Sequence, residues 1–262
     1  MHKFKDCVAV VTGAGSGIGR QLAYQLADAG AQLAISDIVT DSLQETCKEV
    51  ARRGVRVEAT VLDVADQAAL FDYAINVEQQ FGKVNLVINN AGVALSSGPL
   101  QTTSIEDFKW LMDINLYGVL YGTKAFLPIL EKASWGHIVN LSSIFGIISV
   151  PNQTAYNASK FAVVAFTEVL AHEHTDSNVK VLCVCPPPVK TPLLNQARDT
   201  VWPKVFDQTD AIEPEDVLAA IEKALARDEL FVFPGKKTRM AQRMRRWFPN
   251  LIWKNVHQTE GI

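Results

Sequence analysis

The stretch Val8-Ala9-Val10-Val11-Thr12-Gly13-Ala14-Gly15-Ser16-Gly17-Ile18-Gly19 decides the fold of this 262-residue chain. An apolar run is followed by a turn rich in glycine, and then by a segment with the spacing of an amphipathic helix. Glycines permit a tight turn and let the backbone N–H groups at the start of the helix approach a pyrophosphate. This order predicts a nucleotide-binding strand-turn-helix unit rather than a merely structural turn.

The rest of the chain repeats this alternation of strands and helices. Short apolar runs predict seven strands, at Val8–Val11, Gln32–Ser36, Val55–Thr60, Leu86–Asn89, His137–Leu141, Val179–Val184 and Phe231–Phe233. Helical spacing of apolar residues predicts the intervening helices, at Ile18–Ala29, Asp41–Arg53, Gln67–Phe81, Ile105–Glu131, Tyr156–His174 and Pro214–Ala226. Short connections between such elements require parallel strands. We therefore expect one α/β domain over residues 1–262, a Rossmann-like doubly wound parallel seven-stranded sheet with helices on both faces.

The composition is that of a packed globular protein. Its hydrophobic fraction is 48%, and its formal net charge of -3 supplies no overall positive field for a nucleic-acid partner. No signal peptide precedes the first strand and no apolar run is long enough to span a bilayer, so we expect a cytoplasmic protein without an integral membrane segment. No cysteine belongs to a C-x-x-C pair, and we expect reduced thiols, mostly in the core, at Cys7, Cys47, Cys183 and Cys185.

Acidic residues after the second and third predicted strands point to the cofactor. Asp37 lies where a carboxylate accepts hydrogen bonds from the adenosine ribose, and its charge would repel a 2′-phosphate. Ser16 offers no cation to such a phosphate, and Arg20 is expected to point at solvent. NAD(H) is therefore predicted over NADP(H), although Asp37 has the alternative of a helix-capping or loop carboxylate. Asp63 is expected to meet the adenine, or alternatively to cap the helix that starts near Gln67.

Tyr156 and Lys160 lie at i and i+4 of a predicted helix, which places both side chains on one face. A free tyrosine has a pKa of about 10 and is a poor base near neutrality unless a cation stabilises its phenolate. Lys160 would supply that cation. Such pairs also occur on helices as surface or packing pairs, so the surrounding motifs must decide.

Three further motifs accompany this pair: the glycine turn, Asn89-Asn90-Ala91-Gly92 at the end of strand four, and Ser142-Ser143 after strand five. In this order and spacing the sequence resembles the short-chain dehydrogenase/reductase family over nearly the whole chain. The resemblance implies that Tyr156 is the general acid/base, that Lys160 lowers its pKa and binds the nicotinamide ribose, and that Ser143 hydrogen-bonds the substrate oxygen. Ser142 fits the family spacing less well and is expected to be structural.

The resemblance also assigns Asn115, which would hold a water linking Lys160 to solvent; the alternative is a core amide that bends its helix. It implies that the chain forms a homo-oligomer, a tetramer or dimer, built partly on residues 108–130 and 156–174. The predicted contacts to NAD(H) lie in the glycine turn and after the strands, at Gly13, Ser16, Gly17, Ile18, Gly19, Asp37, Asp63, Val64, Asn90, Ala91, Gly92, Tyr156, Lys160, Pro186, Val189 and Thr191.

Two segments depart from the regular pattern. Residues 186–210 form a proline-rich candidate substrate loop, in which Pro187 replaces a glycine that the family usually carries. Proline fixes φ and removes an N–H group, so Pro187 makes either a harmless rigid turn or a reshaped substrate mouth. Residues 236–262 form a basic C-terminal extension, which is interpreted as a membrane-surface segment, a lid over an apolar substrate, or a solvated helix near a subunit boundary.

Together these features predict NAD(H)-dependent interconversion of a secondary alcohol and a ketone. We expect a small apolar substrate because Leu193, Leu194 and Trp202 lie in the candidate loop. An acyl-thioester reductase acting on 3-oxoacyl or fatty-acyl groups would use the same residues, and a non-catalytic nucleotide-binding regulator would keep only the fold. No metal is expected, because His172 and His174 lie on different sides of their helix without a third ligand and are expected to be solvated.

Overall fold

A parallel sheet forms the centre of the computed structural model, which describes residues 4–94, 98–193, 203–204 and 211–262. Its spatial order is β3-β2-β1-β4-β5-β6-β7, so the chain reverses its direction of winding between β1 and β4. In such sheets ligands bind beyond the carboxyl ends of the strands where the order reverses. The seven strands are β1 Val8–Thr12, β2 Gln32–Asp37, β3 Val57–Val61, β4 Leu86–Asn89, β5 Gly136–Leu141, β6 Val179–Val184 and β7 Phe231–Val232.

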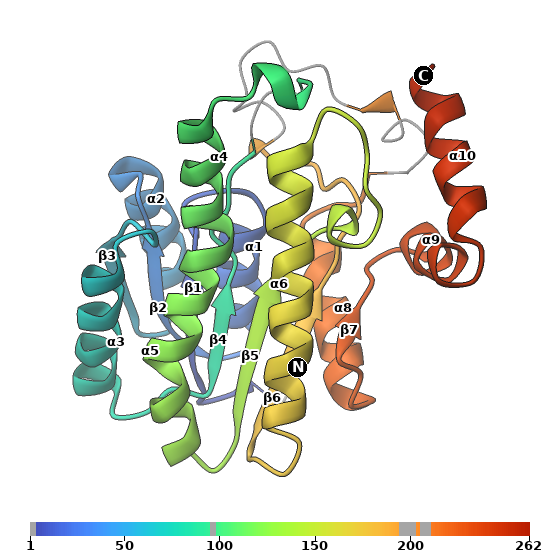
Figure 1. Cartoon of the computed structure of the whole chain (residues 1–262). Coiled ribbons are helices and arrows are strands. Elements are labelled where there is room, and N and C mark those ends of the chain that lie inside the picture. Colours follow the sequence, from blue (N-terminus) through green and yellow to red (C-terminus); the bar gives the residue numbers. More distant parts are fainter. Residues whose placement is uncertain (1–3, 95–97, 194–202, 205–210) are drawn as a thin grey trace.

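Helices cover both faces of this sheet (Figure 1). Helices α1 (Gly17–Asp28), α2 (Thr40–Ala51) and α8 (Glu215–Ala226) pack on one face. Helices α3 (Gln67–Phe81), α5 (Gly118–Lys132) and α6 (Thr154–Glu173) pack on the other. Successive residues of β1 enter opposite cores, because side chains alternate along a strand. The doubly wound parallel fold is therefore confirmed.

The prediction of a single helix over residues 105–131 is wrong. Helix α4 covers Ile105–Met112, a π-helical turn η3 covers Asp113–Tyr117, and α5 begins at Gly118. A π-turn inserts one extra residue into a helix without breaking it, so the apolar spacing on either side still indicates a helix. Gly118 lies close to the loop between β3 and α3: a Cβ added to Gly118 would be 2.8 Å from Val64 Cγ2.

The chain after β7 leaves the sheet and forms two helices, α9 (Lys236–Trp247) and α10 (Pro249–Glu260). Val256 of α10 packs against a small cluster that includes Ile144 and Phe145. Those two residues belong to the short 3₁₀ helix η4 (Ile144–Gly146), and another such turn, η2, covers Leu100–Thr102. Within the described ranges, no helix has the length and apolar character needed to cross a bilayer.

Candidate active site

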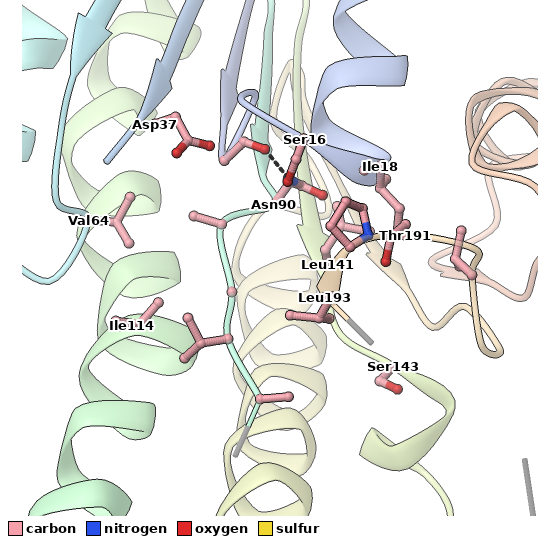
Figure 2. Close-up of a pocket in the computed structure, with 18 of the residues that line it drawn as sticks. Ser16, Ile18, Asp37, Val64, Asn90, Ile114, Leu141, Ser143, Thr191 and Leu193 are labelled. Carbon is pink, nitrogen blue, oxygen red and sulfur yellow. Dashed lines mark hydrogen bonds between the residues drawn. The ribbon is translucent and has the colours of Figure 1, made fainter. Parts of the chain in front are cut away.

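A cavity of about 450 Å³ opens at the carboxyl ends of the central strands (Figure 2). Its walls come from the turn after β1 and from the segments that follow β2 to β6. All the predicted cofactor-binding residues except Gly19 line it, as does Ser143. Figure 2 shows Asp37 at one end of this wall and Ser143 at the other, with Ser16 and Asn90 between them. Residues that are distant in sequence therefore meet where the strand order reverses.

Gly19 does not line the cavity, because it is buried between helix α1 and the glycine turn. A Cβ added to Gly19 would lie 2.2 Å from the carbonyl oxygen of Gly13 and 2.5 Å from Asn90 Nδ2. Asn90 in turn donates from Nδ2 to the carbonyls of Thr12 and Gly13, at 2.9 and 3.2 Å. The third glycine of the turn thus lets helix α1 close onto the loop and onto the end of β4.

Substitution of Gly19 by alanine is expected to destabilise the protein by about 1–3 kcal/mol, because the new methyl group overlaps backbone atoms. Dinucleotide affinity should fall as well, since the turn must move. Urea denaturation and cofactor titration by fluorescence measure the two effects. Gly54→Ala is the control without steric overlap: no atom lies within 4 Å of an added Cβ, so its stability loss reports only its own left-handed φ of +78°, and its dinucleotide affinity should be unchanged. Equal losses in both variants would contradict the assigned role of Gly19.

Asp37 fixes the glycine turn and faces the cavity at the same time. Its Oδ2 accepts a hydrogen bond from Gly15 N at 2.8 Å, and its Oδ1 accepts one from Val39 N at 2.9 Å. A carboxylate has about four acceptor positions, so capacity remains for ribose hydroxyls. Asp63 does not cap α3, because Asp66 Oδ1 accepts from Ala69 N and occupies that position.

Arg20 does not point at solvent as expected. Its Nη2 donates to the carbonyl oxygens of Gly15 and Ser42, at 2.5 and 3.1 Å, and lies 2.8 Å from the carboxylate of Glu45. The guanidinium thus ties the glycine turn to α2. A helical-wheel argument places Arg20 outside the core, but it cannot anticipate that a neighbouring helix supplies acceptors there.

Tyr156 and Ser143 meet in the wall of the cavity. Ser143 is the N-cap of η4, where its Oγ accepts from Phe145 N at 3.1 Å. Burial raises the pKa of Tyr156 above its ordinary value, while a side-chain hydrogen bond with Ser143 acts in the opposite direction. The Tyr156 ring also packs edge-on against Phe145, with centroids 6.4 Å apart. Helix α6 and η4 therefore hold the phenol and the serine hydroxyl together.

Lys160 lies beside this pair and is almost entirely buried. Its Nζ donates to the carbonyl oxygen of Leu141 at 3.1 Å and lies 5.8 Å from the centre of the Tyr156 ring. Burial lowers the pKa of Lys160 to about 8, and Cys183 and Cys185 oppose this shift. Ser142, expected to be structural, donates from Oγ to the Lys160 carbonyl at 2.8 Å and also lines the cavity.

Asn115 lies in the π-turn η3, fully buried behind the cavity. Its Oδ1 accepts from Val93 N at 2.8 Å, and its Nδ2 donates to the Val93 carbonyl at 2.9 Å and to Ser159 Oγ at 3.2 Å. These bonds join the segment after β4 to α6. A Cβ on Gly92 would be 3.1 Å from Asn115 Oδ1 and 3.5 Å from Lys160 Nζ, so the glycine keeps a narrow space between them.

The proline-rich segment after β6 runs along the cavity edge. The Pro186 carbonyl accepts from Ile144 N at 2.8 Å, and the Pro188 carbonyl accepts from Ile212 N at 3.0 Å. Pro187 is buried without a strained φ, and it lines the cavity. Thr191 lies against the glycine turn, 3.0 Å from the position of a Cβ on Gly17. Leu193 also lines the cavity, whereas Leu194 and Trp202 lie outside the described residues.

Sequence reasoning missed one residue that organises the site. Thr12 Oγ1 accepts hydrogen bonds from Asn90 N at 3.0 Å and Ala91 N at 3.1 Å, so it joins the ends of β1 and β4. A threonine placed directly before a glycine turn is the signal that could have identified it. The apolar part of the lining was missed as well; it includes Ile38, Val39, Leu62, Val93, Ala94, Ile114, Leu141 and Pro192.

Among the described residues, no group of three His, Cys, Asp or Glu side chains could hold a metal ion. His172 is exposed, as expected, but His174 is not fully solvated: its side chain is only 14% exposed and lies 3.9 Å from Glu131. The four cysteines carry free thiols, three of them buried and Cys47 partly so.

Comparison with known proteins agrees with this geometry. Residues 7–202 match the sequence profile of the short chain dehydrogenase family. SadH of Mycobacterium tuberculosis, named as a provisional oxidoreductase, is 41% identical over 244 residues, which cover 90% of this chain and 88% of SadH. The cyclohexanol dehydrogenase of Acinetobacter sp. (strain SE19) is 32% identical, with 88% and 92% covered. A short chain dehydrogenase/reductase of Burkholderia phymatum, solved in complex with NAD, superposes with a TM-score of 0.85 at 31% identity, covering 96% of each chain.

Proposed function

Because the chain belongs to the short chain dehydrogenase family, we propose that it is an NAD(H)-dependent oxidoreductase that interconverts a secondary alcohol and a ketone. One observation carries the proposal: Ser143 and Lys160 converge on Tyr156 in the wall of the cavity that the predicted cofactor-binding residues line. The name of the Acinetobacter relative supports an alcohol substrate, and the NAD in the Burkholderia structure supports the cofactor.

The residues of the cavity fit a nicotinamide dinucleotide. Gly13, Ser16, Gly17 and Ile18 line the cavity at the start of α1, where a pyrophosphate is favoured by the backbone N–H groups and the helix dipole. Asp37 would accept the adenosine ribose hydroxyls. When bound, the nicotinamide supplies or accepts hydride in the redox reaction. The segment Pro186–Thr191 and Lys160 would hold its end of the cofactor.

Tyr156 is suited to proton transfer at the substrate oxygen. Its raised pKa keeps the phenol protonated near neutral pH, so it donates a proton when a ketone is reduced. Lys160, with a pKa of about 8, is mainly cationic under these conditions and stabilises the phenolate that remains. Ser143 directs a second hydrogen bond at the developing alkoxide. In alcohol oxidation the same proton moves in the reverse direction.

Asn115 is proposed to complete this proton path by holding a water between Lys160 and solvent. Both hydrogens of its Nδ2 are used, but its Oδ1 makes one hydrogen bond in the described structure and keeps a second acceptor position beside Gly92. The same bonds make Asn115 a brace of the core. The two roles are compatible, because an oxygen held rigidly is the better anchor for a water.

The substrate is proposed to be small and apolar. Val93, Ala94 and Leu193 line the same cavity as Ser143, and their apolar side chains would not pair with a charged substrate. The test is a panel of secondary alcohols, ketones and acyl thioesters, assayed with both cofactors by absorbance of the reduced nicotinamide. Turnover of free alcohols and ketones supports the proposal. Exclusive turnover of acyl thioesters would replace it with a thioester reductase, and no turnover in the panel would favour a nucleotide-binding regulator.

Asp37→Ala is expected to relax cofactor choice. Loss of the carboxylate removes the ribose acceptor and the repulsion of a 2′-phosphate, so the ratio of kcat/KM for NADH over NADPH should fall by about tenfold or more. Asp37→Asn is the matched control, because it keeps one oxygen that can accept from Gly15 N while it removes the charge and the second acceptor oxygen. An unmodified enzyme that is faster with NADPH than with NADH would overturn the cofactor assignment.

A further inference from the structure

The C-terminal helices concentrate positive charge on a chain that is acidic overall. Residues 236–262 contain seven basic residues and one acidic residue, whereas the whole chain has a net charge of -3. Arg239 is paired with Glu229 at 3.2 Å. Four further basic residues, which we call the tail cations, are Arg243, Arg245, Arg246 and Lys254. None of them forms an ion pair with another described residue. This charge is therefore available to an external partner.

Large apolar side chains are exposed beside these cations. On α9, Lys236, Met240, Arg243 and Trp247 follow the spacing of a single helical face, and all four are exposed. The same surface chemistry continues past the end of α9 into α10. The exposed fractions are 62% for Met240, 72% for Trp247, 57% for Phe248, 53% for Leu251 and 60% for Trp253.

The exposed apolar side chains are not needed to pack α9 and α10 against the rest of the protein, because other side chains make those contacts. Thr238 of α9 is buried, and Ile252 and Val256 of α10 pack on the cluster around Phe145. Figure 1 shows α9 and α10 at one edge of the molecule, beside β7 and α8. The exposed aromatic residues therefore form a surface additional to the one that holds the helices in place.

We propose that α9 and α10 dock the enzyme peripherally on an anionic lipid bilayer. Lysine and arginine near a membrane surface attract acidic headgroups, and tryptophan and phenylalanine favour the boundary between headgroups and acyl chains. A second copy of the chain fits poorly, since a two-fold contact would bring the tail cations of both copies together. The mixture of cations and aromatic side chains favours a lipid surface over an acidic protein.

The position of the tail gives this docking a use. The cluster on which α10 packs includes Tyr156 as a partly buried member, so the helix proposed to dock lies next to the wall of the candidate active site. Apolar molecules concentrate in bilayers, and an enzyme held at the surface would meet them at high local concentration. The docking itself does not depend on the proposed reaction and is tested without turnover.

The experiment is co-sedimentation of the full chain with vesicles of phosphatidylcholine alone or mixed with phosphatidylglycerol. We expect binding only to the mixed vesicles, and its loss at high salt, because screening shortens the reach of the tail cations. Arg243→Glu/Arg246→Glu should lower the partition coefficient by more than about tenfold. Trp247→Ser/Phe248→Ser should lower it by about tenfold, since the apolar contribution is lost.

Lys48→Glu/Lys83→Glu is the matched control, because it makes the same charge change at exposed positions distant from the tail and should leave binding intact. Thermal melts confirm that each variant folds. Absence of binding to phosphatidylglycerol vesicles would overturn the proposal. So would a change in oligomeric mass in the tail variants without a change in vesicle binding, which would assign the face to a second copy. Binding that is insensitive to the aromatic pair and equalled by a soluble polyanion would assign it to an acidic partner.

Discussion

Tyr156→Phe is expected to lower kcat by about 10²–10⁴-fold while cofactor binding stays at the parent level. The substitution removes only the phenol oxygen, which is the group proposed to transfer the proton. The ring keeps its edge-on contact with Phe145, and Ser143 keeps its hydrogen bond to the backbone of η4. Steady-state kinetics with a ketone that the parent enzyme reduces measure kcat, and fluorescence titration with NADH measures cofactor binding.

The control for this substitution is Tyr24→Phe. Tyr24 lies on α1 outside the cavity, beneath the guanidinium of Arg53, so loss of its hydroxyl should leave turnover unchanged. A Tyr156→Phe enzyme as active as its parent would remove Tyr156 from the mechanism. A parallel loss of NADH binding would instead show that the substitution disturbs the cavity.

Lys160→Met is expected to change how stability depends on pH. In the folded protein burial lowers the pKa of Lys160 to about 8 from its ordinary value of 10.5. Between these values the unfolded chain binds more protons than the folded one, so Lys160 makes the free energy of unfolding rise as pH rises. The pKa difference corresponds to about 3 kcal/mol. The methionine variant lacks this rise.

The measurement is urea denaturation of parent and variant between pH 7 and 10.5. The stability of the variant relative to its parent should fall by about 3 kcal/mol across this range, whatever offset methionine itself introduces. Taking the difference cancels the contribution of the buried Cys7 thiol, whose raised pKa acts in the opposite direction. Lys180→Met serves as the control, because Lys180 is half exposed and paired with Asp228. A pH-independent difference for Lys160→Met would show that its ammonium is not destabilised by burial.

The sequence predicts this fold well wherever local signals coincide with tertiary ones. Helix α3 begins and ends at the predicted residues because Asp66 caps its N-terminus and Gly82 ends it in a left-handed conformation. Strands β4 and β6 also have their predicted bounds: Asn85 and Asn90 flank β4, while Asn178 precedes β6 and prolines from Pro186 onwards limit its extension. The sheet follows from these elements because parallel connections allow few arrangements.

The candidate site is predictable where backbone geometry determines it and less so where side chains from distant segments meet. The glycine turn and the Tyr156–Lys160 spacing are local features and appear as expected. The π-turn at Asn115 and the attachment of Arg20 to the glycine turn are not local: each depends on acceptors or donors supplied by another element. For the same reason the lowered pKa of Lys160 could not be anticipated, because the burial that lowers it arises where α6 packs against the ends of β5 and β6.

The parallel bridge between Val189 and Ile212 has a consequence for the length of the segment that it closes. Ile212 N donates to the Pro188 carbonyl and Lys190 N donates to the Ile212 carbonyl, at 3.0 and 3.1 Å, so both ends of the intervening segment are clamped beside the cavity. Each doubling of the length of a clamped loop costs only about 0.6 kcal/mol of closure entropy. A change in the number of residues between Val189 and Ile212 would therefore cost little closure entropy, and the bridge would keep both residues beside the cavity.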